Sequence, residues 1–555
     1  MESFDLREKT ETIQSGILVG IGLVQHGRVL LSARRLLGAI LGALALLGLI
    51  AGIQLSSGAY HSDFDADYDE ASHAVSSLLV HDYLVHGLPT NPVAFAENYY
   101  VHYPKVAIGH WPPLFYGSEA LWMLAFGRTR AAMLSIEAFF AFLLLAGVLL
   151  WTARDFGVWA GTAAAVVLLV PQFMQIALFS VAPNMMLALC SFAAAAAYGA
   201  YQQRRSIQSA ILFAVLACVC MGIHGRGVAV ALIPLLAPLL RGRVGLSRWR
   251  ILAGIVAIGA MLWIPMRLGQ AGKTTFGSIA DLARAYADRT VVQLTLLVIL
   301  TAIVGAIRVM RDPDLQSRWL GMAALPLCAW IFHALVNVGM GDRYLITAVP
   351  AIAALFGAGV HQLGSTFRSG SRAIRIGLAA AGVLMCANVA FMALPLQKKP
   401  DLGYHRLVNE GAAALGDSPV YLIAGDPLHE GGLISEIDLR DPLPKHFVLR
   451  GSKMLASSSW VGKGYKTRFQ NAAEVSDFLN TEGVGTVLIQ QPYNLLHAHQ
   501  LLEAVTQNSA NWREEYPPER PAAIRIFRRL GPTPAVPPKI TIDLRNRIGR
   551  TVEAH

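Results

Sequence analysis

The sequence predicts a polytopic α-helical membrane protein that carries a smaller water-soluble α/β domain near its C-terminus. Of the 555 residues, 54% are hydrophobic and only 15% are charged, whereas soluble domains carry about 25% charged residues. The apolar residues are grouped in runs of roughly 17–25, the length that spans a bilayer as a helix. These runs are rich in Ala and Leu and do not alternate with polar residues, so helices rather than barrel strands are expected to satisfy the backbone in lipid.

Residues 1–35 are expected to form a cytoplasmic amphipathic segment that lies on the membrane. They mix acids and bases around a weak apolar stretch, 16–24, which is too short to span a bilayer. The stretch lacks a small-residue cleavage site, so no cleavable signal peptide is predicted.

The membrane domain is expected over 36–397, with about 11–13 transmembrane helices and a large external loop at 56–111. The first span is 36–55. Later spans are expected near 112–126, 130–151, 157–175, 183–201, 208–222, 227–240, 250–268, 290–308, 319–340, 344–362 and 375–395. Lys and Arg collect in the short cytoplasmic loops of membrane proteins. This bias places the segments 56–111, 223–226, 269–289, 341–343 and everything after 396 outside.

One part of this topology is in conflict with itself. Arg128, Arg130 and Arg204 all look cytoplasmic, yet three apolar segments lie between Arg130 and Arg204. Two residues on one side of a membrane are separated by an even number of crossings. Either one segment is re-entrant, or the region between Pro171 and Pro183 hides another short crossing, and the expected total is about 11 or 13 spans.

The character of the chain changes near residue 398. The segment 398–530 is mixed and water-soluble, and we expect it to form an extracytoplasmic α/β domain. Short apolar runs predict buried strands at 420–423 and 487–489, and helical periodicity predicts helices at 472–480 and 495–505. The tail 531–555 is rich in proline and ends in basic residues, which predicts an extended linker.

The composition excludes several classes of function. All five cysteines lie inside apolar segments, namely Cys190, Cys218, Cys220, Cys328 and Cys386, so neither a disulfide framework nor a Cys-based zinc site is predicted. The formal charge of +10 comes mostly from basic residues in short loops between spans. The positive-inside bias explains such residues, and we expect no nucleic-acid partner.

The first candidate for chemistry is an acidic cluster just after the first span. Its members are Asp63, Asp65, Asp67, Asp69 and Glu70. The residues after Glu70 begin an amphipathic helix that we expect to rest on the membrane, with Asp69 at its N-cap and Glu70 in its first turn. A carboxylate held in this way is a candidate general base, and the alternative is a solvated acidic loop.

A second element, Trp111-Pro112-Pro113-Leu114, follows the acidic loop. Proline in the first turn of a helix is favoured because its missing N–H needs no partner there. The pair of prolines by itself therefore indicates only that a helix begins here.

Taken in order, these elements resemble the GT-C glycosyltransferases, and most closely the branch that holds protein O-mannosyltransferases and bacterial aminoarabinose transferases. Gly341-Asp342-Arg343-Tyr344-Leu345 with Pro350 is similar to the Arg-Tyr-Leu…Pro pattern of that branch, and His224-Gly225-Arg226-Gly227 is similar to its basic-Gly turn. The resemblance covers about 36–530. It implies a polyprenyl-phosphate sugar donor, a glycan, lipid or protein acceptor, and an active site on the extracytoplasmic face of the bacterial cytoplasmic (inner) membrane.

In this resemblance Asp69 deprotonates the acceptor hydroxyl, with Glu70 as a second candidate catalytic residue. A phosphate leaving group needs cations nearby. The candidates for donor-phosphate binding are Arg343, Tyr344, Lys105, His110, His73 and Arg226. The alternatives for Arg343 are a snorkelling anchor or an ion pair with Asp342.

The chain departs from the family pattern at two positions. Ser72 stands where aminoarabinose transferases have a basic residue, and Trp111 stands where they have a lysine before the proline. His73 and His110 are the expected substitutes. A neutral histidine is a weaker phosphate partner than a permanent cation.

No metal is assigned from the sequence, although some GT-C branches use a divalent ion. His102, His110, Asp67 and Glu70 could meet around one, but their spacing is not typical of a metal site. The fragment Gly462-Lys463-Gly464 lacks the rest of a phosphate-binding loop and is expected to be a turn.

Two further classes of function compete with the enzyme. A transporter or flippase of a lipid-linked substrate would carry charges within its spans, and Glu137 is the main charge found there. A non-catalytic scaffold with an outer binding domain predicts that replacing Asp69 by Asn is harmless.

Overall fold

The computed structural model describes residues 40–241, 278–336, 341–411, 415–416, 418–426, 429–457, 464–491, 495–518, 523–531, 541–543 and 551–553. The predicted amphipathic segment 1–35, the predicted span 250–268, Gly462-Lys463 and most of the tail 531–555 lie outside these residues. The chain divides into two compact units, one up to Gly52 and one from Ile53 onward. Of the first unit only the start of helix α1 (Ile40–Ser57) is described.

The chain is a multi-pass membrane protein. Among the described residues, five helices are long and apolar enough to cross a bilayer. They are α1, α5 (Arg130–Phe156), α8 (Asn184–Arg204), α15 (Pro313–Leu335) and α17 (Arg372–Ala393). Two bent helix pairs raise the number to as many as seven: α6 (Val158–Leu168) with α7 (Gln172–Phe179), and α13 (Ile279–Leu294) with α14 (Leu296–Arg311).

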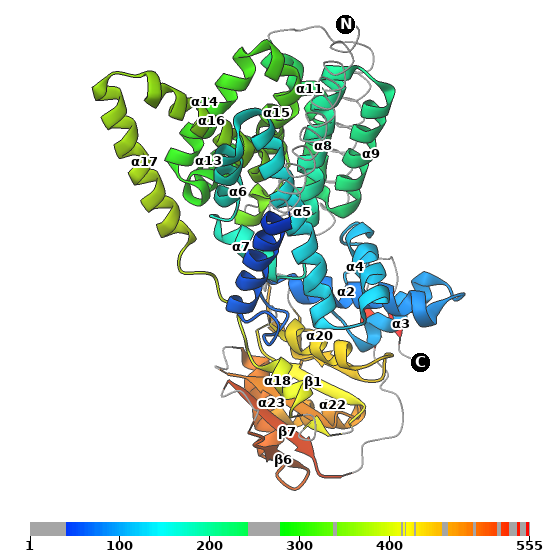
Figure 1. The fold of residues 1–555 in the computed structure, drawn as a ribbon. Helices are drawn as coiled ribbons and strands as arrows, with labels where there is room; N and C mark the ends of the chain where they lie inside the picture. The colour runs from blue at the N-terminus through cyan, green and yellow to red at the C-terminus, as the bar shows by residue number, and fades with distance from the viewer. Residues whose placement is uncertain are drawn as a thin grey trace, which may run out of the picture. The chain divides into compact units, whose positions relative to one another are not determined.

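Other predicted spans also correspond to helices (Figure 1). These are α9 (Ile207–Ile223), α10 (Val228–Ala231) with α11 (Ile233–Leu240), and α16 (Val349–Ser369). The 3-10 turns η2 (Gly225–Gly227) and η4 (Asp342–Leu345) connect helices at the predicted external turns.

The expected cytoplasmic position of Arg128 and Arg130, and with it the span at 112–126, is wrong relative to the rest of the topology. Helix α4 (Leu114–Phe126) is followed by Arg128, whose guanidinium binds both carboxylate oxygens of Asp82 at 2.9 Å and the Asp438 carboxylate at 3.1 Å. Asp82 belongs to the first loop and Asp438 to the C-terminal domain. Because these contacts place both ends of α4 on one side, α4 does not cross the membrane, and the parity conflict disappears.

Close packing at glycine holds two of the spans together. A Cβ atom on Gly199 of α8 would overlap the carbonyl oxygen of Arg318 on α15, and one on Gly321 of α15 would overlap the carbonyl oxygen of Ala195 on α8. Small residues let helix backbones approach in this way in membranes. The contact fixes α8, which begins at Asn184, against α15, which leads to the turn carrying Arg343.

The C-terminal domain is built on a five-stranded mixed sheet in the order β2-β1-β5-β7-β6. The strands are β1 (Val420–Ala424), β2 (Phe447–Arg450), β5 (Thr486–Gln490), β6 (Trp512–Glu515) and β7 (Ile524–Arg529). Strand β1 pairs in parallel with β2 and β5, while β7 pairs antiparallel with β5 and β6. The predicted strands at 420–423 and 487–489 are confirmed as β1 and β5.

Helices cover both faces of this sheet (Figure 1). They are α18 (Tyr404–Asn409), α20 (Glu430–Arg440), α21 (Gly451–Met454), α22 (Ala472–Thr481) and α23 (Leu496–Thr506). The predicted helices at 472–480 and 495–505 are confirmed as α22 and α23. Short two-residue strands β3 (Ala456–Ser457) and β4 (Lys466–Thr467) pair beside the sheet, and β8 (Thr541–Asp543) pairs with β9 (Thr551–Glu553) in the tail.

The first loop folds as part of the C-terminal domain. It contains α2 (Glu70–Asp82), the π-helix η1 (Tyr83–Gly87) and α3 (Pro92–His102). Tyr99 and Tyr103 are fully buried in the same apolar cluster as Tyr421 and Ile423 of β1. The predicted helix after Asp69 therefore exists as α2, but it is buried between α4 and α20 rather than resting on the membrane.

Candidate active site

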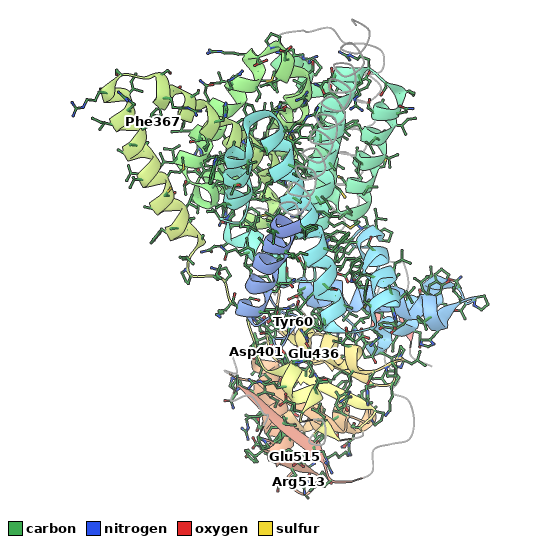
Figure 2. The ribbon with its side chains drawn as sticks, in the orientation of Figure 1. Tyr60, Phe367, Asp401, Glu436, Arg513 and Glu515 are labelled. Carbon is green, nitrogen blue, oxygen red and sulfur yellow. The ribbon has the colours of Figure 1, made fainter. Side chains whose placement is uncertain are left out.

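The acidic cluster after the first span is not a solvated loop, because each of its carboxylates has a partner. Asp63 accepts hydrogen bonds from the backbone N–H groups of Leu402 and His405, both at 2.7 Å. Burial, together with the charges of Glu436 and Asp401, raises the pKa of Asp63 to about 6. Glu436 and Asp401 are labelled in Figure 2.

Three other acids of the cluster bind basic side chains. Asp65 is paired with His429 of the C-terminal domain, and Asp67 and Asp69 are both paired with Arg343. Burial alone would raise the pKa of Asp67, but Arg343 and the backbone N–H of Asp69 outweigh burial and lower it. The sequence did not single out Asp67 for this role. Its i, i+2 spacing from Asp69 in a non-helical segment was the signal that both could face one partner.

The two carboxylate oxygens of Asp69 differ: one is hydrogen-bonded, and the other has no partner among the described residues. Its Oδ2 accepts a hydrogen bond of 2.6 Å from Arg343, and its backbone N–H donates to Asp67 Oδ1 at 2.8 Å. Asp69 is 4% exposed, and its Oδ1 is buried with no hydrogen-bond donor among the described residues. It occupies the N-cap of α2 as predicted, yet its side chain does not cap the helix. A carboxylate oriented through one oxygen, with the other free, can accept a proton from a bound group.

Arg343 lies at the centre of the site. Its neighbour Asp342 is paired with Arg289 and accepts a 3.0 Å bond from Gln293, so the alternative of an Asp342–Arg343 ion pair is wrong. Burial alone would lower the pKa of Arg343, but the ion pairs with Asp67 and Asp69 raise it overall.

Arg226 supports Arg343 from a second membrane turn. Its guanidinium donates to the carbonyl oxygen of Arg343 at 2.6 Å and to Asn184 Oδ1 at 3.2 Å. It also lies 5.2 Å from the centre of the Tyr344 ring, a cation–π distance. Burial, and after it the charge of Arg343, lowers the pKa of Arg226 to about 10, so it stays charged at neutral pH. Tyr344 itself stacks in parallel on His333 at 5.4 Å.

His73 belongs to the site, where its ring is neutral. Its Nδ1 lies 2.9 Å from the Tyr116 hydroxyl, and its ring packs 4.4 Å from that of Trp111. Burial lowers the pKa of His73 to about 4, so the ring is neutral at pH 7. A neutral ring is a weaker phosphate partner than a cation, and the predicted place of His73 in the phosphate site stays a prediction. The ring of His110 also packs against Trp111, with 4.4 Å between the ring centres.

Glu70 and Asp69 bind different partners. Its carboxylate binds Lys399 at 2.7 Å and accepts backbone N–H bonds from Ala66 at 2.6 Å and Val181 at 2.9 Å. Both members of the ion pair are fully buried. These contacts occupy both carboxylate oxygens, so the geometry favours a structural role for Glu70. Its predicted catalytic role stays a prediction. Lys399 was not predicted, since nothing local in the sequence links it to residue 70.

Lys105 approaches Asp69 from the side of the C-terminal domain. It is 7% exposed, and the charges that act on it come from Arg450, Asp69, Glu430 and Asp65. The contacts of Arg343 and Arg226 come instead from membrane-side turns. The charge of Asp69 acts on Lys105 and also on Arg226.

A metal centre is not assembled in the described part of the chain, where no group of three or more His, Cys, Asp or Glu side chains could hold an ion. Of the sequence candidates, Asp67 and Glu70 are engaged by Arg343 and Lys399, while His102 stacks on Phe447 at 4.1 Å.

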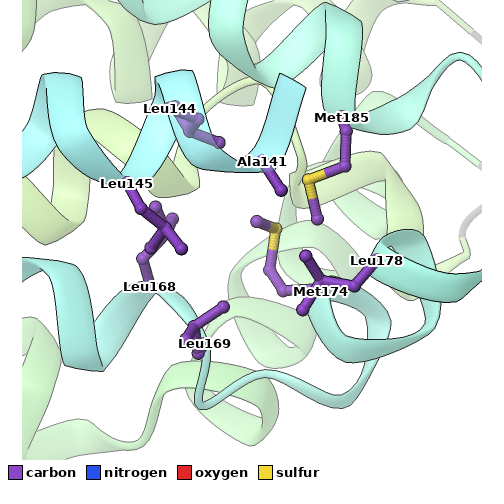
Figure 3. Close-up of a pocket in the computed structure, with 8 residues that line it drawn as sticks. All are labelled: Ala141, Leu144, Leu145, Leu168, Leu169, Met174, Leu178 and Met185. Atoms are coloured by element: carbon purple, nitrogen blue, oxygen red, sulfur yellow. The ribbon is translucent and has the colours of Figure 1, made fainter. Parts of the chain in front are cut away.

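A cavity between α5, α6, α7 and α8 has a different character (Figure 3). It is lined only by apolar side chains: Ala141, Leu144, Leu145, Leu168, Leu169, Met174, Leu178 and Met185. It therefore offers no group for acid–base chemistry.

Comparison with known proteins supports this architecture. No protein-family model and no curated protein sequence matches the chain. ArnT from Cupriavidus metallidurans bound to undecaprenyl phosphate aligns over 89% of this chain and 98% of its own, with TM-score 0.52 and 12% identity. Its apo state aligns over the same shares with TM-score 0.52 and 13% identity. The apo Archaeoglobus fulgidus oligosaccharyltransferase aligns over 81% of this chain and 69% of its own, at TM-score 0.48 and 12% identity. The chain is thus a multi-pass membrane protein with the GT-C fold.

Proposed function

We propose that this protein is a membrane glycosyltransferase that moves a sugar from a polyprenyl-phosphate donor to an acceptor hydroxyl, with Asp69 as general base. The observation that carries the proposal is the buried Oδ1 of Asp69, which has no hydrogen-bond donor among the described residues. Two arginines lie beside it: Arg343, held by Asp67 and by the other oxygen of Asp69, and Arg226, held by Asn184 and the carbonyl of Arg343. The fold is consistent with it, because ArnT, which shares this fold, was solved with undecaprenyl phosphate bound.

The proposed reaction needs a proton acceptor and a stabilised leaving group. The acceptor O–H bond breaks and its proton passes to Asp69 Oδ1, while the acceptor oxygen forms a bond to the anomeric carbon. The bond between that carbon and the phosphate oxygen breaks, and polyprenyl phosphate leaves. Arg343 and Arg226 provide fixed positive charge for the phosphate, and such preorganised charge is worth most where water is excluded.

We further propose that the site faces the extracytoplasmic side of the bacterial cytoplasmic membrane. The acceptor is then a glycan, lipid or protein of the cell envelope. The first loop, Arg128 and the C-terminal domain share one side of the membrane, which supports a single compartment for base and acceptor.

The test replaces Asp69 by Asn and compares it with Asp67→Asn. Both residues bind Arg343, but only Asp69 has an open buried oxygen. We expect Asp69→Asn to lower the consumption of labelled polyprenyl-phosphate sugar by about 10²- to 10⁴-fold, the usual contribution of a general base. Asp67→Asn should cost less than about tenfold, since an amide oxygen still accepts from the Asp69 N–H.

Binding of undecaprenyl phosphate to the same purified variants serves as the control for folding. Wild-type turnover by Asp69→Asn would remove Asp69 from the chemistry. A protein that binds the lipid and carries it across vesicles, but never consumes the sugar donor, would instead be the flippase. Glu137, buried with one unpartnered oxygen among the described residues, is the observation that favours that alternative.

A further inference from the structure

Lys105 is a nearly buried residue, and its ammonium has no direct polar partner in the described part of the chain. The side chain is 7% exposed, and its Nζ has no hydrogen bond and no salt bridge within 4 Å among the residues that the structure describes. It lies against Gly431 of α20, where a Cβ atom would come within 2.9 Å of Nζ. An ammonium with so little water around it gains from a negatively charged group placed against it, and a bound anion would supply that group.

The acids around Lys105 act on it through their charge alone, because each is in direct contact with another group. Glu430 accepts from Arg450 Nε at 3.0 Å and from the Ser452 N–H at 2.9 Å. Asp65 is paired with His429, and Asp69 is paired with Arg343. Burial, and then the charge of Arg450, lowers the pKa of Lys105 to about 8, which leaves it charged at pH 7.

The position of Lys105 in the fold is typical of a ligand site. His429 and Glu430 follow strand β1, and Arg450 and Ser452 end or follow strand β2. These are neighbouring parallel strands, and ligands of α/β sheets bind outside the carboxyl ends of such strands. Lys105, which reaches this edge from the first loop, also interacts electrostatically with Asp69.

We propose that Lys105, at the carboxyl edge of β1 and β2, binds an oxyanion (a phosphate or carboxylate group) carried by the acceptor. The proposal rests on the proposed function and revises one prediction, since Lys105 was expected to bind the donor phosphate. Asp69 then lies between the donor cations Arg343 and Arg226 and the acceptor cation Lys105. A base between the two substrates is what transfer to an acceptor hydroxyl requires.

The experiment uses two probes on the purified full-length protein: inorganic phosphate for the Lys105 site and undecaprenyl phosphate for the donor site. Phosphate binding is measured by ³¹P NMR titration, with and without saturating undecaprenyl phosphate. We expect Lys105→Gln to weaken phosphate binding at least tenfold, as for loss of a charge-assisted contact. Its affinity for undecaprenyl phosphate should stay within about twofold of wild type.

A second variant keeps the charge of Lys105 but shifts the position of its ammonium. Gly431→Ala introduces a Cβ that displaces the flexible end of Lys105 and also comes within 3.0 Å of the Ala71 Cβ on α2. It should also weaken phosphate binding about fivefold or more. Melting temperature controls for folding, and Lys105→Gln should not lower it, since it removes a buried unpaired charge.

Three outcomes overturn the proposal: unchanged phosphate binding in Lys105→Gln, displacement of phosphate by undecaprenyl phosphate, or a loss of lipid binding as large as that of Arg343→Ala. The last two would return Lys105 to the donor site. If wild type binds phosphate through Lys105 but neither binds nor consumes a lipid-linked donor, the oxyanion site stands and the proposed transferase fails.

Discussion

Replacing the adjacent carboxylates Asp69 and Glu70 by their amides is expected to have different effects: the first should lower turnover and the second should lower stability. Glu70→Gln keeps the shape of the side chain but removes the negative charge beside Lys399. Because both partners are fully buried, water cannot take the place of the lost charge, and we expect a loss of stability rather than a specific loss of chemistry.

The magnitude follows from the environment of Lys399. Breaking a buried ion pair by removing one partner costs about 3–5 kcal/mol, since it leaves an uncompensated charge. Glu70 also accepts backbone N–H bonds from Ala66 and Val181. An amide has only one accepting oxygen, so one of these N–H groups loses its partner at a cost of about 1–3 kcal/mol. Burial already raises the pKa of Glu70 and lowers that of Lys399, and the ion pair opposes both shifts.

The assay is unfolding of the purified protein in mixed micelles, followed by tryptophan fluorescence. Glu410→Gln is the matched control, because Glu410 is exposed and surface substitutions usually stay within about 0.5 kcal/mol. The double variant Glu70→Gln/Lys399→Met should regain most of the loss, since an apolar replacement of a buried pair is often neutral. The reasoning is refuted if Glu70→Gln unfolds like wild type and yet loses turnover as Asp69→Asn does.

Two further predictions concern Arg343 and His73. Arg343→Ala should weaken undecaprenyl phosphate binding by about 10- to 100-fold, the usual effect of losing a charged hydrogen-bonding group, and should lower turnover at saturating donor less. The control is Arg289→Ala, which removes a half-exposed ion pair. If Arg343→Ala binds undecaprenyl phosphate as tightly as Arg289→Ala does, the proposed role of Arg343 is contradicted. For His73, whose pKa is lowered by burial from 6.5 to about 4, the unfolded chain takes up the proton first. Stability should therefore be full above pH 6.5 and fall by roughly 3 kcal/mol as pH drops to 4. His73→Phe should flatten this acid limb in pH-dependent unfolding, and an unchanged limb would show that His73 is not its source.

The fold was predictable from sequence where the signal is local. Both faces of β1 and β5 are buried. Successive side chains point to opposite faces, so Leu422 and Val487 lie in one apolar cluster and Ile423 and Leu488 in the other, and short uninterrupted apolar runs are typical of such strands. The predicted span at α4 was wrong because its position depends on contacts that are distant in the sequence. Its apolar composition is that of a span, and only the contacts of Arg128 with Asp82 and Asp438, 46 and 310 residues away, reveal which side it ends on.

The candidate site was predictable only in part, because its contacts are long-range. Asp69 and Arg343 were expected at one site through resemblance to a known family, although 274 residues separate them. Composition could not predict that Asp342 binds Arg289 while its neighbour binds Asp69. Nor could it predict that His73 is neutral, since its pKa is set by burial under Trp111 and beside Tyr116.

The geometry of the first turn of α2 explains why the neighbouring residues Asp69 and Glu70 have different roles. Successive residues at the start of a helix point about 100° apart, so three consecutive side chains cannot share one pocket. Asp69 faces Arg343 on a membrane-side turn, Glu70 faces Lys399 just beyond the last described span, and Ala71 lies against the helix that carries Gly431, beside Lys105. The ion pair of Glu70 therefore fixes the rotation of α2, and that rotation sets the direction of Asp69. A variant that loosens Glu70 should lower turnover only as far as it lets α2 turn, so restoring its packing with Lys399→Met should restore activity together with stability.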